Sequence, residues 1–115
     1  MKKIQSILVT ISIVLPSVTF AQSLEEYVST TTRINDNMEV RILVKDLAAR
    51  LAYDEAMNEG VENYNARKRE LLNKDGDRYG AVALKRLMKF CAGDKTIKLY
   101  SKPDEDTCSY IKTLE

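Results

Sequence analysis

MEVRILVKDLAARL, residues 38–51, is the clearest helical pattern in the chain. Its large apolar side chains recur at spacings of three and four residues, which places them within about 100° on a helical wheel. They are Val40, Leu43, Val44, Leu47 and Leu51. Charged residues occupy most of the other positions. The segment is therefore predicted to be a helix with one buried face and one solvated face.

The apolar positions shift after Leu51. The new stripe is rotated well away from the first, so the helix either bends near Tyr53 or continues and packs different partners at its two ends. The stripe contains Tyr53, Met57, Gly60, Val61, Tyr64, Leu71 and Leu72. Gly60 is a second expected break, because glycine costs about 1 kcal/mol relative to alanine in a helix interior. The polar run 73–77 contains Gly76 and predicts a turn.

The C-terminal third predicts two more helices. Residues 79–91 are amphipathic, and Gly93 stands where a helix stop belongs. Residues 103–106, Pro-Asp-Glu-Asp, place a proline and three acids at the start of a last helix. Between these helices, residues 96–100 alternate apolar and polar side chains, which is compatible with a short extended segment.

The chain is predicted to be all-α: a small bundle of four to five helices with one disulfide. The first of these helices begins at Leu24, because Ser23 and Glu26 have the spacing of a capping box. It is expected to be short, since residues 28–32, Val-Ser-Thr-Thr-Thr, favour a strand over a helix. We find no linker or repeat, so residues 22–115 are interpreted as a single helical domain.

Residues 1–21 have the three parts of a secretory signal peptide. A short basic start precedes the uncharged apolar run 4–15, and small residues, Thr19 and Ala21, precede a predicted cut before Gln22. The apolar run is shorter than the roughly 20 residues that span a bilayer, so cleavage is expected and not stable membrane insertion. The Lys-Lys start is typical of bacteria, which makes the periplasm the predicted destination.

Composition excludes several classes of function. The 115 residues include 18 basic and 17 acidic side chains, and loss of the two signal-peptide lysines leaves 16 basic ones. A net charge this close to zero gives no argument for nucleic acid as a partner. The chain has no His, and no G-x-S-x-G motif is present. We therefore predict no enzymatic activity, no catalytic residue, no cofactor and no metal site. Asp54 is interpreted as the end of the first apolar stripe, in preference to a buried functional acid.

The two cysteines, Cys91 and Cys108, allow one intramolecular bridge. An oxidising compartment favours it, and the spacing is not that of a C-x-x-C redox motif. Cys91 closes the apolar face of one predicted helix and Cys108 lies early in the next. A structural disulfide is therefore predicted, with free or intermolecular thiols as the alternative.

The basic residues Lys85, Arg86 and Lys89 are the predicted partner-binding residues. They lack acids at favourable helical spacing, whereas the cluster 67–69 has glutamates close by. The alternative is an ordinary solvated helix face. Six tyrosines against two phenylalanines suit an interface, although they also suit the shallow core of a small domain.

These features together predict a small secreted, non-enzymatic domain that binds another protein of the bacterial envelope. The favoured form is an inhibitor or immunity-type binder. The alternatives are an accessory or assembly subunit of an envelope machine, of the conjugation or secretion type, and a periplasmic chaperone. The sequence identifies neither the partner nor the oligomeric state.

Overall fold

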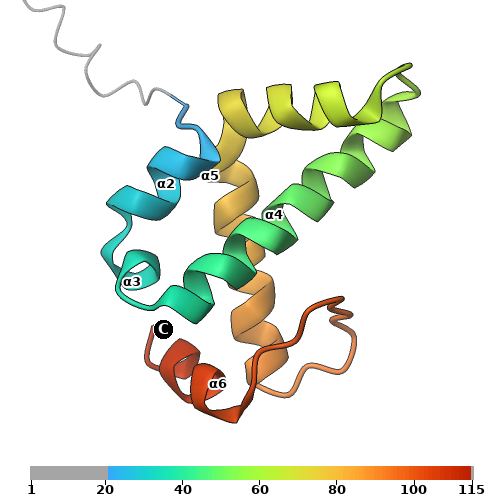
Figure 1. Ribbon diagram of the computed structural model, residues 1–115. Helices are drawn as coiled ribbons and strands as arrows, with labels where there is room; N and C mark the ends of the chain where they lie inside the picture. Colours follow the sequence, from blue (N-terminus) through green and yellow to red (C-terminus); the bar gives the residue numbers. More distant parts are fainter. Residues whose placement is uncertain (1–20, 115) are drawn as a thin grey trace, which may run out of the picture.

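The computed structural model describes residues 21–114, and within that range the chain is helical and has no strand (Figure 1). The predicted signal peptide lies outside the described residues except for Ala21. Five helices follow in order: α2 (Leu24–Thr30), α3 (Thr32–Asn35), α4 (Met38–Glu59), α5 (Tyr64–Cys91) and α6 (Glu105–Lys112). The prediction of a small all-α bundle with one disulfide is confirmed.

Helix α4 is continuous, so the alternative of a bend near Tyr53 is wrong. It begins at Asn37, whose side-chain Oδ1 accepts a hydrogen bond from the Val40 amide at 3.1 Å. It ends at Gly60, which has φ of +71° and closes the helix in the left-handed conformation that glycine favours. The predicted break at Gly60 is therefore confirmed.

The buried face of α4 differs from the predicted stripe: it contains Val40, Leu43 and Val44 and continues through alanines, whereas Leu47 and Leu51 are half-buried. Residues spaced by four along one line are fully buried; they are Val40, Val44, Ala48, Ala52 and Ala56. Small side chains on this line let α5 approach closely, and α4 and α5 share the largest interface in the bundle. The second predicted stripe is wrong in part: Met57 and Tyr64 are 47% and 38% exposed, whereas Leu71 is buried and Leu72 packs against the core.

The predicted turn at 73–77 is also wrong: α5 runs through it with a kink. Only Asp75 leaves helical geometry there, with φ of −130° and ψ of 29°. Gly76 packs against the backbone at the start of α2, and the Asp77 amide donates a hydrogen bond to the Gln22 carbonyl oxygen at 3.2 Å. Figure 1 shows α5 changing direction sharply at this point and passing behind α4. Contacts with α2 thus convert a turn-forming sequence into a kinked helix.

Helix α2 begins with a capping box, and it packs on the rest of the bundle through its buried residues Leu24 and Val28. Ser23 Oγ accepts from the Glu26 amide at 3.1 Å, and the Ser23 amide donates to Glu26 Oε1 at 3.2 Å. The hydroxyl groups of Ser29 and Thr30 donate to helix carbonyl oxygens one turn earlier, which accommodates these residues in a helix. The predicted start at Leu24 is confirmed.

The C-terminal helix α6 is capped by Asp104, whose Oδ1 accepts from the Thr107 amide at 2.8 Å. Its Ile111 is fully buried. Hydrogen bonds also join this end of the chain to α3: Arg33 Nη1 donates to the Leu114 carbonyl oxygen at 3.1 Å, and the Tyr110 hydroxyl donates to the Arg33 carbonyl oxygen at 2.7 Å. The last helix is therefore tied to the beginning of the domain.

The predicted disulfide between Cys91 and Cys108 is present and joins the end of α5 to α6, with the two Cα atoms 5.2 Å apart. It closes a loop in which residues 96–100 form neither helix nor strand. The predicted alternation is visible in the burial of this segment. Leu99 is only 9% exposed, whereas Lys98 and Tyr100 face the solvent.

Candidate binding cleft

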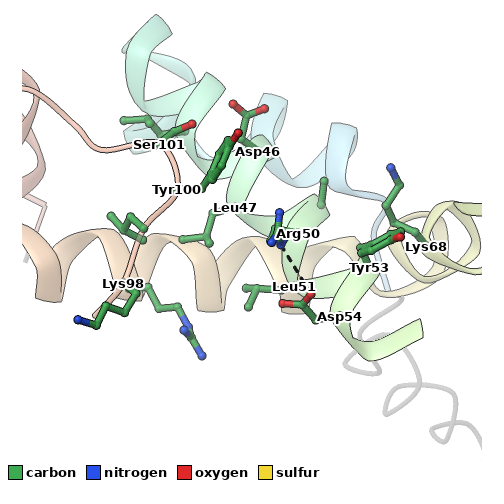
Figure 2. A pocket seen from close by; sticks show the side chains of 14 residues that line it. Asp46, Leu47, Arg50, Leu51, Tyr53, Asp54, Lys68, Lys98, Tyr100 and Ser101 are labelled. Atoms are coloured by element: carbon green, nitrogen blue, oxygen red, sulfur yellow. Dashed lines mark ion pairs between the residues drawn. The ribbon is translucent and has the colours of Figure 1, made fainter. Parts of the chain in front are cut away.

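A cleft of about 760 Å³ lies between α4, α5 and the disulfide-closed loop (Figure 2). Its apolar lining consists mainly of leucines, which are Leu43, Leu47, Leu51 and Leu99. The lining residues contributed by α4 extend from Leu43 to Asp54. From Leu43 to Asp54 the helix rises by eleven steps, or about 16 Å, which is the length of about five residues of extended chain.

Cations outnumber acids around this cleft. The basic lining residues are Arg50, Lys68, Arg86 and Lys98, and the acidic ones are Asp46 and Asp54. Arg50 and Asp54 face each other with Nε and Oδ1 3.7 Å apart, so one acid is already matched within the cleft. Figure 2 shows Lys68 and Tyr53 at one end, Lys98 and Tyr100 at the other, and the Arg50–Asp54 pair between them.

The disulfide-closed loop supplies one wall of the cleft through residues 98–101. Leu99 anchors this wall in the core, while Tyr100 is 93% exposed and its ring centroid lies 5.9 Å from the Arg50 guanidinium. Asp94 orders the beginning of the loop by accepting hydrogen bonds from the hydroxyl and the amide of Thr96 at 2.6 and 2.9 Å. These bonds lower the pKa of the Asp94 carboxyl group below its usual value. The loop is therefore ordered on both sides of Lys98, and it presents the exposed Tyr100 ring to the solvent.

The predicted basic residues Lys85, Arg86 and Lys89 are exposed on the second half of α5. Among residues 21–114, no carboxylate lies within 4.0 Å of their charged nitrogens. The structure divides the set, because Arg86 lines the cleft and Lys85 and Lys89 do not. A helix turns by about 100° per residue, so Arg86 points away from the direction that Lys85 takes.

A second polar cluster joins α4 to α5 and has a structural role. The Tyr79 hydroxyl donates to Glu55 Oε1 at 2.6 Å and accepts from Arg78 Nη2 at 3.1 Å. Burial and the hydrogen bond to Glu55 raise the pKa of Tyr79 to about 12. Arg78 Nη2 lies 3.6 Å from Asp75 Oδ2, so the cluster also includes the residue at the kink of α5. It fixes the kink against α4 and lies outside the cleft.

Sequence reasoning missed most of the cleft. Arg50 was assigned to the solvated face of its helix, and Lys68 was considered compensated by nearby glutamates. Lys98 and Tyr100 carried no functional prediction beyond the mild tyrosine signal. The alternation at 96–100 was the available signal, since it predicts that Lys98 and Tyr100 face outward once Leu99 is buried. Asp54 lines the cleft beside Arg50 and is exposed, not a buried acid.

Comparison with known proteins gives no match: no family model, no curated protein and no solved structure is similar to this chain. Within residues 21–114, no group of three or more His, Cys, Asp or Glu side chains is placed to hold a metal ion. None of the helices in this range combines the length and the apolar character needed to cross a membrane.

Proposed function

We propose that this protein is a small exported, non-enzymatic domain that binds another protein of the bacterial envelope, in the manner of an inhibitor or immunity protein. The observation that carries the proposal is the leucine-lined cleft with its excess of cations, one of which, Arg86, belongs to the exposed basic set Lys85, Arg86 and Lys89 of α5. Apolar area for burial and charges for steering are the two contributions that a protein–protein interface combines.

The side chains available for chemistry support a binding role. The chain has no His, and its two cysteines are joined in the disulfide. A nucleophile activated by an adjacent imidazole, or a thiolate nucleophile, is therefore not available. The disulfide, the continuous helix α4 and the kinked helix α5 packed on it instead give a pre-organised surface, which lowers the entropic cost of stoichiometric binding.

The disulfide also supports export, because structural disulfides persist in oxidising compartments. We predict that the mature protein begins at Gln22. Thr19 and Ala21 provide the small residues before the cut, and the Gln22 carbonyl oxygen makes the hydrogen bond to Asp77 described above. The intact mass of protein from the periplasmic fraction should correspond to residues 22–115. A membrane-held species that retains residues 1–21 would contradict this prediction and the proposed location.

Reversing the charges of the three exposed basic residues of α5 is expected to slow association with the partner. Replacing Lys85, Arg86 and Lys89 with Glu should lower the association rate constant about tenfold or more and reduce its dependence on salt, with little effect on folding, because the side chains are exposed. The measurement uses a partner captured from periplasmic extract and identified by mass spectrometry, followed by binding kinetics at two or more salt concentrations.

The matched control reverses three other exposed cations, Arg69, Lys74 and Lys112, and gives the same net charge. It should bind at nearly the wild-type rate. Equal slowing in both variants would mean that only net charge matters, and unchanged binding in both would place the interface elsewhere. An oligomer of the free protein would favour the alternative of a machine subunit, and exposure of apolar surface below about pH 5 would favour a chaperone.

A further inference from the structure

We propose that the cleft holds an acidic polypeptide segment of the partner, with Tyr100 as the principal anchor. This inference rests on the proposed binding function and adds the chemistry of the bound segment. The segment carries at least two carboxylates close to an aliphatic or aromatic side chain.

The charges that line the cleft indicate that the ligand is negatively charged. Four cations and two acids line the cleft, a net charge of +2; of the acids, Asp54 faces Arg50, and Asp46 lies on the α4 side of the cleft. Lys68, Arg86 and Lys98 have no carboxylate within 4.0 Å among residues 21–114. They come from two different segments of α5 and from the loop, and Figure 2 shows Lys68 and Lys98 at opposite ends of the cleft. A chain with carboxylates spaced along it would meet them in turn.

The floor of the cleft and Tyr100 indicate that the ligand also has an apolar part. Of the four leucines in the lining, Leu43 and Leu99 are already buried, whereas Leu47 and Leu51 are half-buried, and a free anion or a bare sugar phosphate would leave the exposed parts of these two in water. Tyr100 is 93% exposed at the lip, beside the Arg50 guanidinium. Tyrosine and arginine are the residues that most often dominate binding energy at protein interfaces. An apolar side chain of the ligand would cover the leucines, and the Tyr100 ring would pack over it.

The backbone of the loop favours a polypeptide over other anions. In the described range, residues 98–102 make no backbone–backbone hydrogen bond, so the fold leaves main-chain groups in this wall of the cleft that an extended chain could pair with. The disulfide closes this loop and Leu99 anchors it, which reduces the conformational entropy lost on binding. The cleft length of about five extended residues suits such a segment.

Peptide display on the disulfide-bonded mature protein tests the inference without knowledge of the partner. A random library of twelve-residue peptides should yield enriched sequences with two or more Asp or Glu near an aliphatic or aromatic residue. Synthetic copies of the enriched peptides are then titrated against the wild-type protein and its variants. No enrichment, or enrichment of neutral or basic peptides, would overturn the inference.

Two variants and two matched controls locate the binding. Tyr100→Ala and Lys98→Glu should each weaken peptide binding at least about tenfold, since both side chains are exposed and neither supports the fold. Met38→Ala removes another exposed apolar side chain, 64% exposed, and Lys112→Glu reverses another exposed cation. Both controls should bind within about twofold of the wild type. Equal weakening in variants and controls would show binding outside the cleft and overturn the inference.

Failure of the inference is distinguishable from failure of the proposed function. A protein partner whose binding depends on Lys85 and Lys89 but not on Tyr100 or Lys98 would overturn the inference and leave the proposed function intact. Acidic peptides that bind in the cleft would support the inference even if no envelope partner exists. Binding to vesicles that contain phosphatidylglycerol, weakened by Lys98→Glu, without enrichment of acidic peptides would assign the cleft to lipid headgroups and overturn it.

Discussion

Gly76→Ala is expected to lower the free energy of unfolding by about 2 kcal/mol, the net of the overpacking and hydrogen-bond losses and a gain in helix propensity. A β-carbon at this position would lie 2.5 Å from Leu24 Cα and would also overlap the adjoining backbone of Ser23 and Leu24. Backbone atoms cannot rotate away as side chains can, so α2 must separate from α5. That movement gives an overpacking cost of about 1–3 kcal/mol and removes the hydrogen bond from Asp77 to Gln22, at about 0.5–1.5 kcal/mol.

Helix propensity alone predicts that Gly76→Ala raises the free energy of unfolding, so the measurement distinguishes the two effects. Alanine in place of glycine in a helix interior stabilises by about 1 kcal/mol where nothing touches the new methyl group. Asn73→Ala is the matched control, because Asn73 is exposed on the same helix just before the kink. Urea unfolding should show destabilisation for Gly76→Ala and no loss for Asn73→Ala. A stabilised Gly76→Ala protein would mean that α2 does not rest on the kink.

The kink also explains why the sequence misled the prediction at 73–77. Asn, Asp and Gly in succession favour a turn, and locally nothing distinguishes a turn from a kinked helix. The difference lies in residues 22–24, about fifty positions away, which supply the hydrogen-bond acceptor and the backbone surface for Gly76. Helix starts were easier to predict, because a cap such as Ser23 or Asp104 acts within three residues of its partner.

The candidate site was predictable only in part, for the same reason. Arg86 could be singled out because acids are missing at helical spacing around it, which is a local property. Its neighbours in the cleft, Lys68 and Lys98, come from a different half of α5 and from the loop. Their meeting depends on the kink of α5 and on the disulfide, and neither the direction of a kink nor the path of a loop follows from periodicity.

Replacing both Cys91 and Cys108 with Ser is expected to lower the free energy of unfolding by about 2–5 kcal/mol. The two residues are 17 positions apart, and closure of a loop of that size in the unfolded chain corresponds to about 3 kcal/mol. The loss is large for a domain of this size, whose total stability is expected to be about 5–15 kcal/mol.

The loss of ordered structure in the double variant should be local and begin after Gly93. Helices α4 and α5 are held together by their own buried interface, which does not depend on the disulfide. Helix α6 keeps Ile111 in the core and two hydrogen bonds to Arg33, so it should loosen without detaching completely. Hydrogen exchange should therefore accelerate in residues 94–112 of the double variant, while amides around Val44 in α4 stay protected. The wild-type protein after reduction by a thiol should give the same pattern.

Because residues 98–101 lie between the two cysteines, loss of the disulfide should also loosen one wall of the cleft. At a temperature where the double variant remains folded, it is therefore expected to bind acidic peptides more weakly than the wild-type protein does. Exchange that rises uniformly along the chain would show instead that the disulfide supports the whole core. Unchanged exchange and unchanged stability would show that the bridge is dispensable for the fold, and a redox or intermolecular role of the two thiols would then account for their presence.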